Sequence, residues 1–191
     1  MEGMVINMAI YIKLPLDEKT AQSLRAGDEV LLTGTIYTAR DAAHKRLVEL
    51  LQDGGVLPLD LSGAIIYYAG PTAAPPGRAT GSIGPTTSSR MDAYTPQLLQ
   101  RGVAGIIGKG PRSETVKTAF TDAGAVYFAA VGGAGALLAQ RVKSSEVVAF
   151  PELGAEAIRK LEVEDFPVTV ALDTTGADYY TTARAEYLAS L

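Results

Sequence analysis

Hydroxyl and cationic side chains lie together in one segment whose residue types could bind an anion. It reads Gly81-Ser82-Ile83-Gly84-Pro85-Thr86-Thr87-Ser88-Ser89-Arg90-Met91-Asp92. Glycines and a proline shape the turn, and four consecutive hydroxyl residues follow, of the kind that cap a helix start. Arg90 comes about one turn later, where a guanidinium adds charged donors to free backbone N–H groups. The segment predicts a carboxylate or phosphate site, with an ordinary capped loop and a solvated arginine as the alternative.

A similar junction lies earlier in the chain. Thr38 and Asp41 have the spacing of a capping box, which predicts a helix that begins at Thr38 and runs to about residue 53. Arg40 then falls in the first turn, and His44 follows four residues later on the same face. Surface charges at Arg40 and Asp41, with His44 packed at a helix edge, remain the plainer interpretation of this pattern.

A third cation completes the set. Lys109 stands between two glycines just after a predicted buried strand at residues 103–107. In a parallel α/β sheet such strand ends gather along one edge, so Arg40, Arg90 and Lys109 are expected to converge. Paired charge-assisted hydrogen bonds from two arginines suit a small di-anion. The alternative for Lys109 is a flexible turn with a solvated amine. No Asp/His/Ser trio is evident, so the sequence supports half of an active site.

Alternating strands and helices predict an α/β fold, in a single domain over residues 1–191. The strands are expected at residues 8–14, 29–37, 64–69, 103–107, 125–131, 146–150 and 166–173. Helices are expected at residues 38–53, from residue 95, and at 113–124, 132–141 and 154–160. The long loop at 70–81 is typical of a functional or partner-covered segment. The tail, residues 174–191, is expected either to fray or to dock on a partner.

Composition excludes several classes of protein. A net charge of −4 leaves no broad basic face for nucleic acid. Because the chain has no cysteine and one histidine, it cannot supply a disulfide, a Cys-ligated cluster or a multi-His metal site. We therefore expect no metal ligands from this chain. Glycines interrupt the uncharged run at 123–140, which favours a buried strand–turn–helix unit over a membrane span. The N-terminus lacks the pattern of a secretion signal, which predicts a cytoplasmic protein.

Two long segments resemble the signature segments of the class I, iron–sulfur-dependent fumarate hydratases. They are Thr38-Ala39-Arg40-Asp41-Ala42-Ala43-His44-Lys45-Arg46 and Gly84-Pro85-Thr86-Thr87-Ser88-Ser89-Arg90-Met91-Asp92. The likeness is to the C-terminal domain of these enzymes, which in some species is a separate β subunit, and to L(+)-tartrate dehydratase β subunits. Further matching stretches extend it from about residue 14 to residue 180.

This resemblance implies a swivelling β/β/α domain, sheet-centred with helices packed on it. It implies reversible hydration of fumarate to L-malate at a [4Fe–4S] cluster held by the α subunit, in a hetero-oligomer such as α2β2. Carried over by motif, Arg40, Arg90 and Lys109 would bind substrate carboxylates, and Thr87 would hydrogen-bond the substrate. Thr86 would be the candidate base for the C3 proton, with Asp41 and His44 as orienting groups behind these residues.

Other functions remain open at this point. Within the same family, tartrate dehydration is the alternative to fumarate hydration. A non-catalytic module that binds phosphate or another anion would use the same glycine-rich loop and helix starts. In an assembly subunit, the loops would serve only an interface with other chains.

Overall fold

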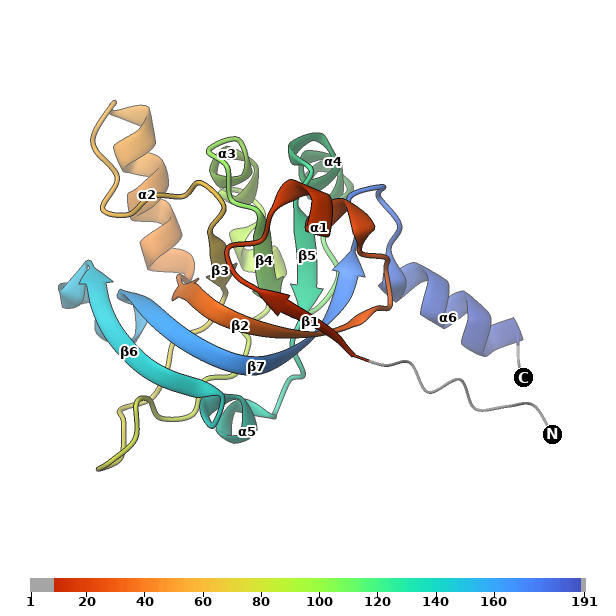
Figure 1. Cartoon of the computed structure of the whole chain (residues 1–191). Coiled ribbons are helices and arrows are strands. Elements are labelled where there is room, and N and C mark those ends of the chain that lie inside the picture. Colours follow the sequence, from red (N-terminus) through yellow and green to blue (C-terminus); the bar gives the residue numbers. More distant parts are fainter. Residues whose placement is uncertain (1–8, 190–191) are drawn as a thin grey trace.

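The strands form a closed sheet in the computed structural model, which describes residues 9–189. Within that range the sheet runs in the order β2-β3-β4-β5-β7 and closes because β7 also pairs with β2 (Figure 1). Four neighbouring strands are parallel: β2 (Glu29–Thr38), β3 (Ile65–Tyr67), β4 (Gly105–Gly108) and β5 (Val126–Ala129). The long strand β7 (Ile158–Leu172) is antiparallel to both β2 and β5. This mixed sheet with helices confirms the predicted α/β class.

Two further strands and the helices surround this closed sheet. β1 (Ile10–Lys13) lies parallel to β2, and β6 (Val142–Ala149) is antiparallel to β7. The helices are α1 (Glu18–Ser23), α2 (Asp41–Gln52), α3 (Thr95–Leu99), α4 (Glu114–Ala123), α5 (Gly135–Ala139) and α6 (Tyr179–Ala189). Two 3-10 helices, η1 (Ser88–Met91) and η2 (Pro151–Glu156), complete the set. Figure 1 shows α2, α3 and α4 together on one side of the sheet and α5 on the other.

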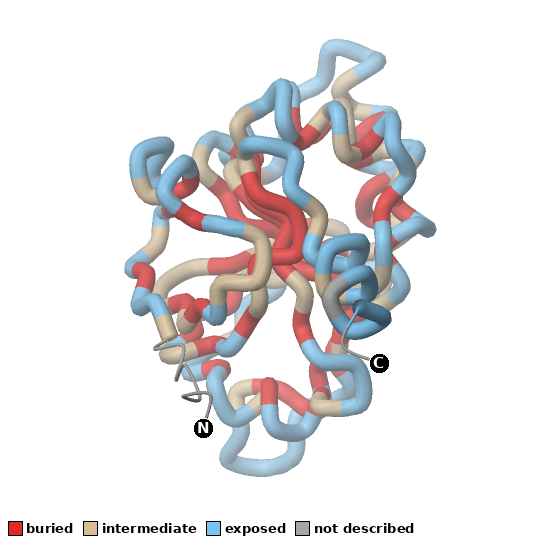
Figure 2. Tube along the Cα trace, turned by 90° about the vertical axis from the view of Figure 1, so that its right-hand side faces the viewer, coloured by how far each residue is buried: buried red, intermediate tan, exposed pale blue. Residues whose placement is uncertain are grey.

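Strand periodicity divides the apolar side chains between two cores. In β3 and the residue after it, Ile65 and Tyr67 belong to a cluster inside the closed sheet, whereas Ile66 and Tyr68 join one beneath the helices. All four are buried, as expected of a strand covered on both faces. Buried positions accordingly concentrate in the central strands in Figure 2, and exposed positions in the surrounding loops and helices.

The helix predicted at residues 154–160 is wrong. The 3-10 helix η2 ends at Glu156, and the residues from Ile158 onward form the first part of β7. Residues 158–163 hydrogen-bond to β2 on one edge and to β6 on the other. Two ladders of backbone bonds outweigh the weak helical preference of this stretch. The strand expected at 166–173 is consequently fifteen residues long and begins at Ile158.

The cap predicted for the second helix is also wrong. Thr38 is the last residue of β2, and its hydroxyl donates to the carbonyl of Ala157 at 3.4 Å. The helix α2 begins at Asp41, with Arg40 at the N-cap position. Its free backbone N–H groups are served from a distant segment instead, since Ala42 N donates to Glu156 Oε2 at 3.0 Å. A carboxylate at a helix N-terminus also complements the helix dipole.

The two ends of the chain bear on separate predictions. Residues 1–8, which carry the start of the first predicted strand and the N-terminal pattern, lie outside the described residues. At the other end, α6 is tied to the domain by an ion pair between Asp178 and Lys117 at 2.7 Å and by Gly110 N donating to Tyr180 Oη at 2.9 Å. Among the helices of residues 9–189, each is too short or too polar to cross a bilayer.

Phe166 offers a test of the closed sheet. Its ring is fully buried inside the sheet and packs edge-on against Tyr67, with ring centroids 5.4 Å apart. We expect Phe166→Ala to lower the free energy of unfolding by about 3–5 kcal/mol, since it leaves a cavity that the sheet cannot collapse to fill. Urea denaturation measures this loss. Tyr11→Ala, at an exposed position of β1, should change the free energy of unfolding by less than about 0.5 kcal/mol. Equal losses in the two variants would contradict the placement of Phe166 in the core of the closed sheet.

Candidate functional site

Two of the predicted arginines share one carboxylate. Arg90 Nε donates to Asp41 Oδ1 at 2.9 Å, and Arg40 Nε lies 3.9 Å from Asp41 Oδ2. These residues come from different elements, because Asp41 opens α2 and Arg90 lies in η1. The structure therefore brings the two signature segments together at Asp41.

A second carboxylate fixes Arg40 from behind. Arg40 Nη2 lies 3.5 Å from Glu156 Oε1, and the other oxygen of Glu156 accepts from the start of α2. Glu156 thus orients both the guanidinium and the helix that carries it. Sequence reasoning missed this residue, because it placed Glu156 in the middle of a helix over residues 154–160, whereas Glu156 is the last residue of η2.

Gly70 leaves the space that Arg40 occupies. A Cβ at Gly70 would lie 2.9 Å from Arg40 Cδ and 2.7 Å from the carbonyl oxygen of Ala155. These contacts are closer than any side chain tolerates without a shift of its neighbours. The end of β3 therefore needs a glycine at this point so that the arginine can pass.

His44 supports Arg40 through its backbone. The imidazole is fully buried, and Nδ1 lies 2.9 Å from the Arg40 carbonyl oxygen, so Nδ1 carries the proton and donates. The ring packs edge-on against Tyr68 at 5.0 Å, and Nε2 has no partner among the described residues. Burial lowers the pKa of His44 to about 4, so the ring is neutral at pH 7. His44 thus lies beneath Arg40, well inside the domain and not at a helix edge.

The hydroxyl segment and Lys109 are joined through their backbones. Thr87 and Lys109 form an isolated parallel bridge, Ser88 N donates to the Lys109 carbonyl at 3.1 Å, and Lys109 N donates to Ser88 Oγ at 3.0 Å. The predicted helix start is in fact the short 3-10 helix η1, with Thr87 at its N-cap position. The adjacent segments Thr86–Arg90 and Lys109–Gly110 are therefore held in a fixed register.

Ser88 is a residue that sequence reasoning listed without assigning a role. Its side chain is fully buried, and its Oγ lies 2.9 Å from the hydroxyl of Tyr127, which in turn donates to the Gly110 carbonyl at 2.8 Å. A Cβ at Gly108 would lie 2.0 Å from Ser88 Oγ. Ser88 thus fits only because the strand beneath it ends in glycine.

A buried arginine supports this segment from the core side. Arg112 donates to Asp92 Oδ1 at 2.8 Å and to Thr95 Oγ1 at 2.9 Å. Its guanidinium also lies 5.1 Å from the ring centre of Tyr127 and 5.4 Å from that of Tyr68, which is within cation–π range. Sequence reasoning missed Arg112, since nothing in its spacing separates it from a surface arginine. It fixes the residue that follows η1.

The exposed donors of the site remain available to a ligand. The side chain of Arg90 is half exposed, and Thr87 is exposed while Thr86 is half-buried. The Thr86 and Thr87 hydroxyls make no hydrogen bond within residues 9–189, and in the same range Lys109 joins no ion pair. The Lys109 amine lies beside the turn at Gly132, where an added Cβ would be 3.8 Å from Nζ. Such an arrangement can bind carboxylates.

The side chains around these donors include no evident strong base and no group of metal ligands within the described residues. Burial raises the pKa values of Tyr68 and Tyr127, so neither phenol ionises near neutral pH. Within the described range no three His, Cys, Asp or Glu side chains are grouped as metal ligands would be. The side chains described here can therefore bind an anion through charge-assisted hydrogen bonds, and the half-buried Thr86 lies in the adjoining segment.

Comparison with known proteins gives this geometry a family context. The family model described as "Fumarase C-terminus" matches residues 4–183. "Fumarate hydratase class I, aerobic" of Escherichia coli is 47% identical over 175 residues, which are 90% of this chain and 32% of that protein. "Fumarate hydratase 2" of Leishmania major is 40% identical over 178 residues, or 91% of this chain and 31% of that protein. The chain thus spans about a third of the length of these relatives.

A shorter relative matches over nearly its whole length. A protein of Methanocaldococcus jannaschii named "Putative L(+)-tartrate dehydratase subunit beta" is 43% identical over 171 residues, which cover 86% of this chain and 88% of that protein. This relative therefore consists almost entirely of the region that the present chain aligns with.

His44 makes the stability of the domain depend on pH. Its pKa is about 4 in the folded chain and 6.5 ordinarily, so between these values the unfolded chain binds the additional proton. The free energy of unfolding should therefore fall as the pH drops from 7 toward 4, by up to roughly 3 kcal/mol from this residue. His44→Asn, whose amide can still donate to the Arg40 carbonyl, should show a smaller fall. Urea denaturation at pH 7 and pH 4.5 measures both, and identical falls would contradict the assignment.

Proposed function

The chain belongs to the fumarase C-terminus family, and from this premise we propose that it is the β subunit of a hydro-lyase that reversibly hydrates fumarate to L-malate. The observation that carries the proposal is the pair of arginines on Asp41, beside the hydroxyl segment and Lys109. Such a site offers several charged donors to a four-carbon diacid, whose two carboxylates need them. Residues 1–191 act as one domain in this proposal.

The roles follow from what each side chain can donate or accept. Arg40, Arg90 and Lys109 bind the substrate carboxylates, and Thr87 donates a hydrogen bond to the substrate. Asp41 and His44 hold the arginines in place and contact no substrate. In the dehydration direction a proton leaves C3, the hydroxyl leaves C2 as water with a second proton, and a double bond forms between C2 and C3. Thr86 is the proposed acceptor of the C3 proton, and its alcohol needs an activating group.

The residues of this chain do not fit an iron–sulfur cluster. The sequence has no cysteine to supply thiolates, and the described residues hold no group of three other ligands. In the proposal a [4Fe–4S] cluster belongs to a partner α subunit and supplies Lewis-acid chemistry when bound. The assembly is a hetero-oligomer such as α2β2. In the proposal this chain binds the substrate carboxylates, and it is a swivelling domain that docks against the cluster-bearing subunit.

A second substrate has specific support within the same reaction class. The relative from Methanocaldococcus jannaschii matches over 88% of its length and is named for L(+)-tartrate dehydration. Tartrate is also a four-carbon diacid, and it carries one more hydroxyl group than malate. The same cationic groups would bind its carboxylates, so we retain L(+)-tartrate as the alternative substrate of the proposed enzyme.

Co-expression with a cluster-bearing α subunit tests the proposed activity. We expect the isolated chain to be colourless and inactive, and the complex to be brown, oxygen-sensitive and active on malate or tartrate. In that complex Arg90→Gln should lower kcat/KM at least about 100-fold through lost charge-assisted hydrogen bonds. Thr86→Val should lower kcat more than it raises KM.

Arg101→Gln is the matched control for these variants. It removes the same charge from an exposed position after α3 and should leave kcat/KM unchanged. Full activity of the Arg90 and Thr86 variants would show that the site is wrongly assigned. If substitutions at Arg40, Arg90 and Lys109 instead weaken association with the partner while the complex that still forms keeps its turnover, the result would support an assembly role.

A further inference from the structure

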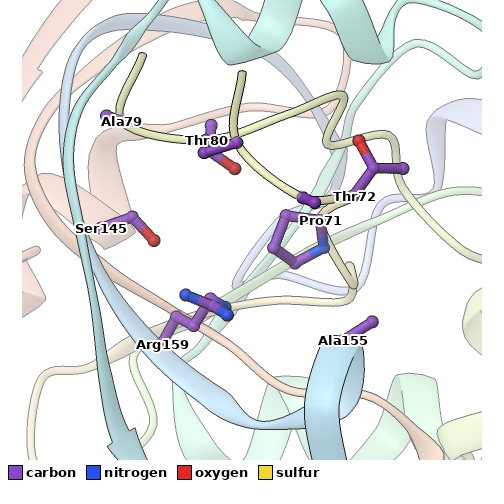
Figure 3. A pocket seen from close by; sticks show the side chains of 9 residues that line it. Pro71, Thr72, Ala79, Thr80, Ser145, Ala155 and Arg159 are labelled. Carbon is purple, nitrogen blue, oxygen red and sulfur yellow. The ribbon is translucent and has the colours of Figure 1, made fainter. Parts of the chain in front are cut away.

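A polar pocket lies beside the loop that follows β3, separate from the candidate functional site. It has a volume of about 240 Å³ and lies between that loop, β6, β7 and η2 (Figure 3). Its polar lining comes from Thr72 and Thr80 of the loop, Ser145 of β6 and Arg159 of β7. The other lining residues are alanines and Pro71, and none is acidic. The pocket thus presents one full positive charge and three hydroxyl groups.

Two of these polar groups are buried without a partner. Thr80 is 4% exposed, and its Oγ1 has no hydrogen-bond partner among the described residues. The Nε of Arg159 is likewise buried and unpartnered, and within residues 9–189 this guanidinium joins no ion pair. Buried donors that lack acceptors are costly, and native proteins leave few of them. A bound acceptor would remove that cost.

The fold holds these groups in fixed places. Arg159 N donates to Thr38 Oγ1 at 3.1 Å, and Arg159 pairs with Val147 across the β6–β7 ladder. Ser145 lies on the same face of that ladder, two positions earlier in β6, and the loop is closed by Thr72 N donating to the Ser82 carbonyl at 3.0 Å. Figure 3 shows Arg159, Ser145 and Thr80 around one central space. Ser145 and Arg159 thus lie on paired strands, and the loop after β3 supplies most of the other lining residues.

We propose that this pocket binds a small oxyanion, a carboxylate or a phosphate, through Arg159, Thr80 and Ser145. A guanidinium can donate two parallel hydrogen bonds to either group, and the hydroxyls supply further donors to the remaining oxygens. The absence of any acidic lining residue favours an anion over a cation or a neutral ligand. The proposal does not depend on the fumarate hydratase assignment, because its residues are separate from Arg40, Arg90 and Lys109.

Titration of the full chain with inorganic phosphate, and separately with malonate, tests this site. Amide chemical shifts of Thr80, Ser145 and Arg159 should move with either or both anions, and the two titrations tell a phosphate site from a carboxylate site. Arg159→Gln should weaken binding at least about 10-fold, since charge-assisted hydrogen bonds are lost. Arg101→Gln should leave the affinity unchanged.

The pocket shares Ala155 with the surroundings of Arg40, so the two sites must be told apart. Arg90→Gln should leave the shifts at Thr80 and Ser145 intact. Shifts confined to residues 86–90 and 109, or unchanged affinity in Arg159→Gln, would overturn the proposal. If Arg159→Gln does not fold, Thr80→Val is decisive: it should weaken binding several-fold without lowering Tm, and unchanged affinity would refute the site.

Discussion

The closure of the sheet by β7 is the constraint on which the other features depend. This strand hydrogen-bonds to β2 and β5, and its first half also carries β6. Because β7 is antiparallel to β2, it begins at the end of the sheet where β2 finishes, with Arg159 opposite Thr38. The residues just before β7 therefore lie beside the start of α2. Glu156 contacts Arg40 and Ala42 because the start of β7 fixes the position of the residues just before it.

Electrostatic compensation explains how Arg40 and Arg90 can lie close together. Asp41 contacts both arginines, and Glu156 contacts Arg40 from the other side. These contacts reduce the mutual repulsion of the two guanidinium groups. They engage the Nε of Arg90 and leave its side chain half exposed. Surface ion pairs alone add little to stability, so the function of these carboxylates is to orient. In the proposed enzyme a diacid would meet cations that are already positioned, which lowers the entropy lost on binding.

The strands and most of the helices could be predicted in order from the sequence, whereas α6, the strand that replaces the helix expected at 154–160, and the long-range polar contacts could not. The helix expected at 113–124 is α4, which Gly124 ends in the left-handed conformation, and the helix expected from residue 95 is α3, with Pro96 in its first turn. These are local signals. Thr38 had the correct spacing for a cap, yet β2 continues through it because β7 offers backbone partners. Intrinsic propensity determines whether a segment forms a helix or a strand only where tertiary contacts do not favour the other structure.

The supporting residues of the site illustrate why sequence reasoning found the cations and missed what orients them. Arg40 and Arg90 follow threonines at predicted helix starts, and Lys109 stands between two glycines, which are local patterns that the sequence shows directly. Ser88 and Arg112 act through contacts 20 or more residues away, and Glu156 acts across 114 residues. Each of them contributes by lying beneath or behind a donor, and burial of that kind follows from packing of the whole domain. His44 shows the same limit, because its spacing placed it on a helix face but not in the core.

The ionisation states of the side chains around the site limit which of them can accept a proton from the substrate. Burial lowers the pKa of His44 to about 4, which makes its neutral imidazole a weak base, and burial raises the pKa values of Tyr68 and Tyr127, so these phenols keep their protons. Asp41 and Glu156 are engaged with arginines, which leaves the Thr86 hydroxyl as the proposed proton acceptor. An alcohol ionises far above neutral pH and becomes a base only next to a strong electrophile or a second base. In the proposed enzyme this chain would bind the substrate, and the group that activates Thr86 would come from the partner.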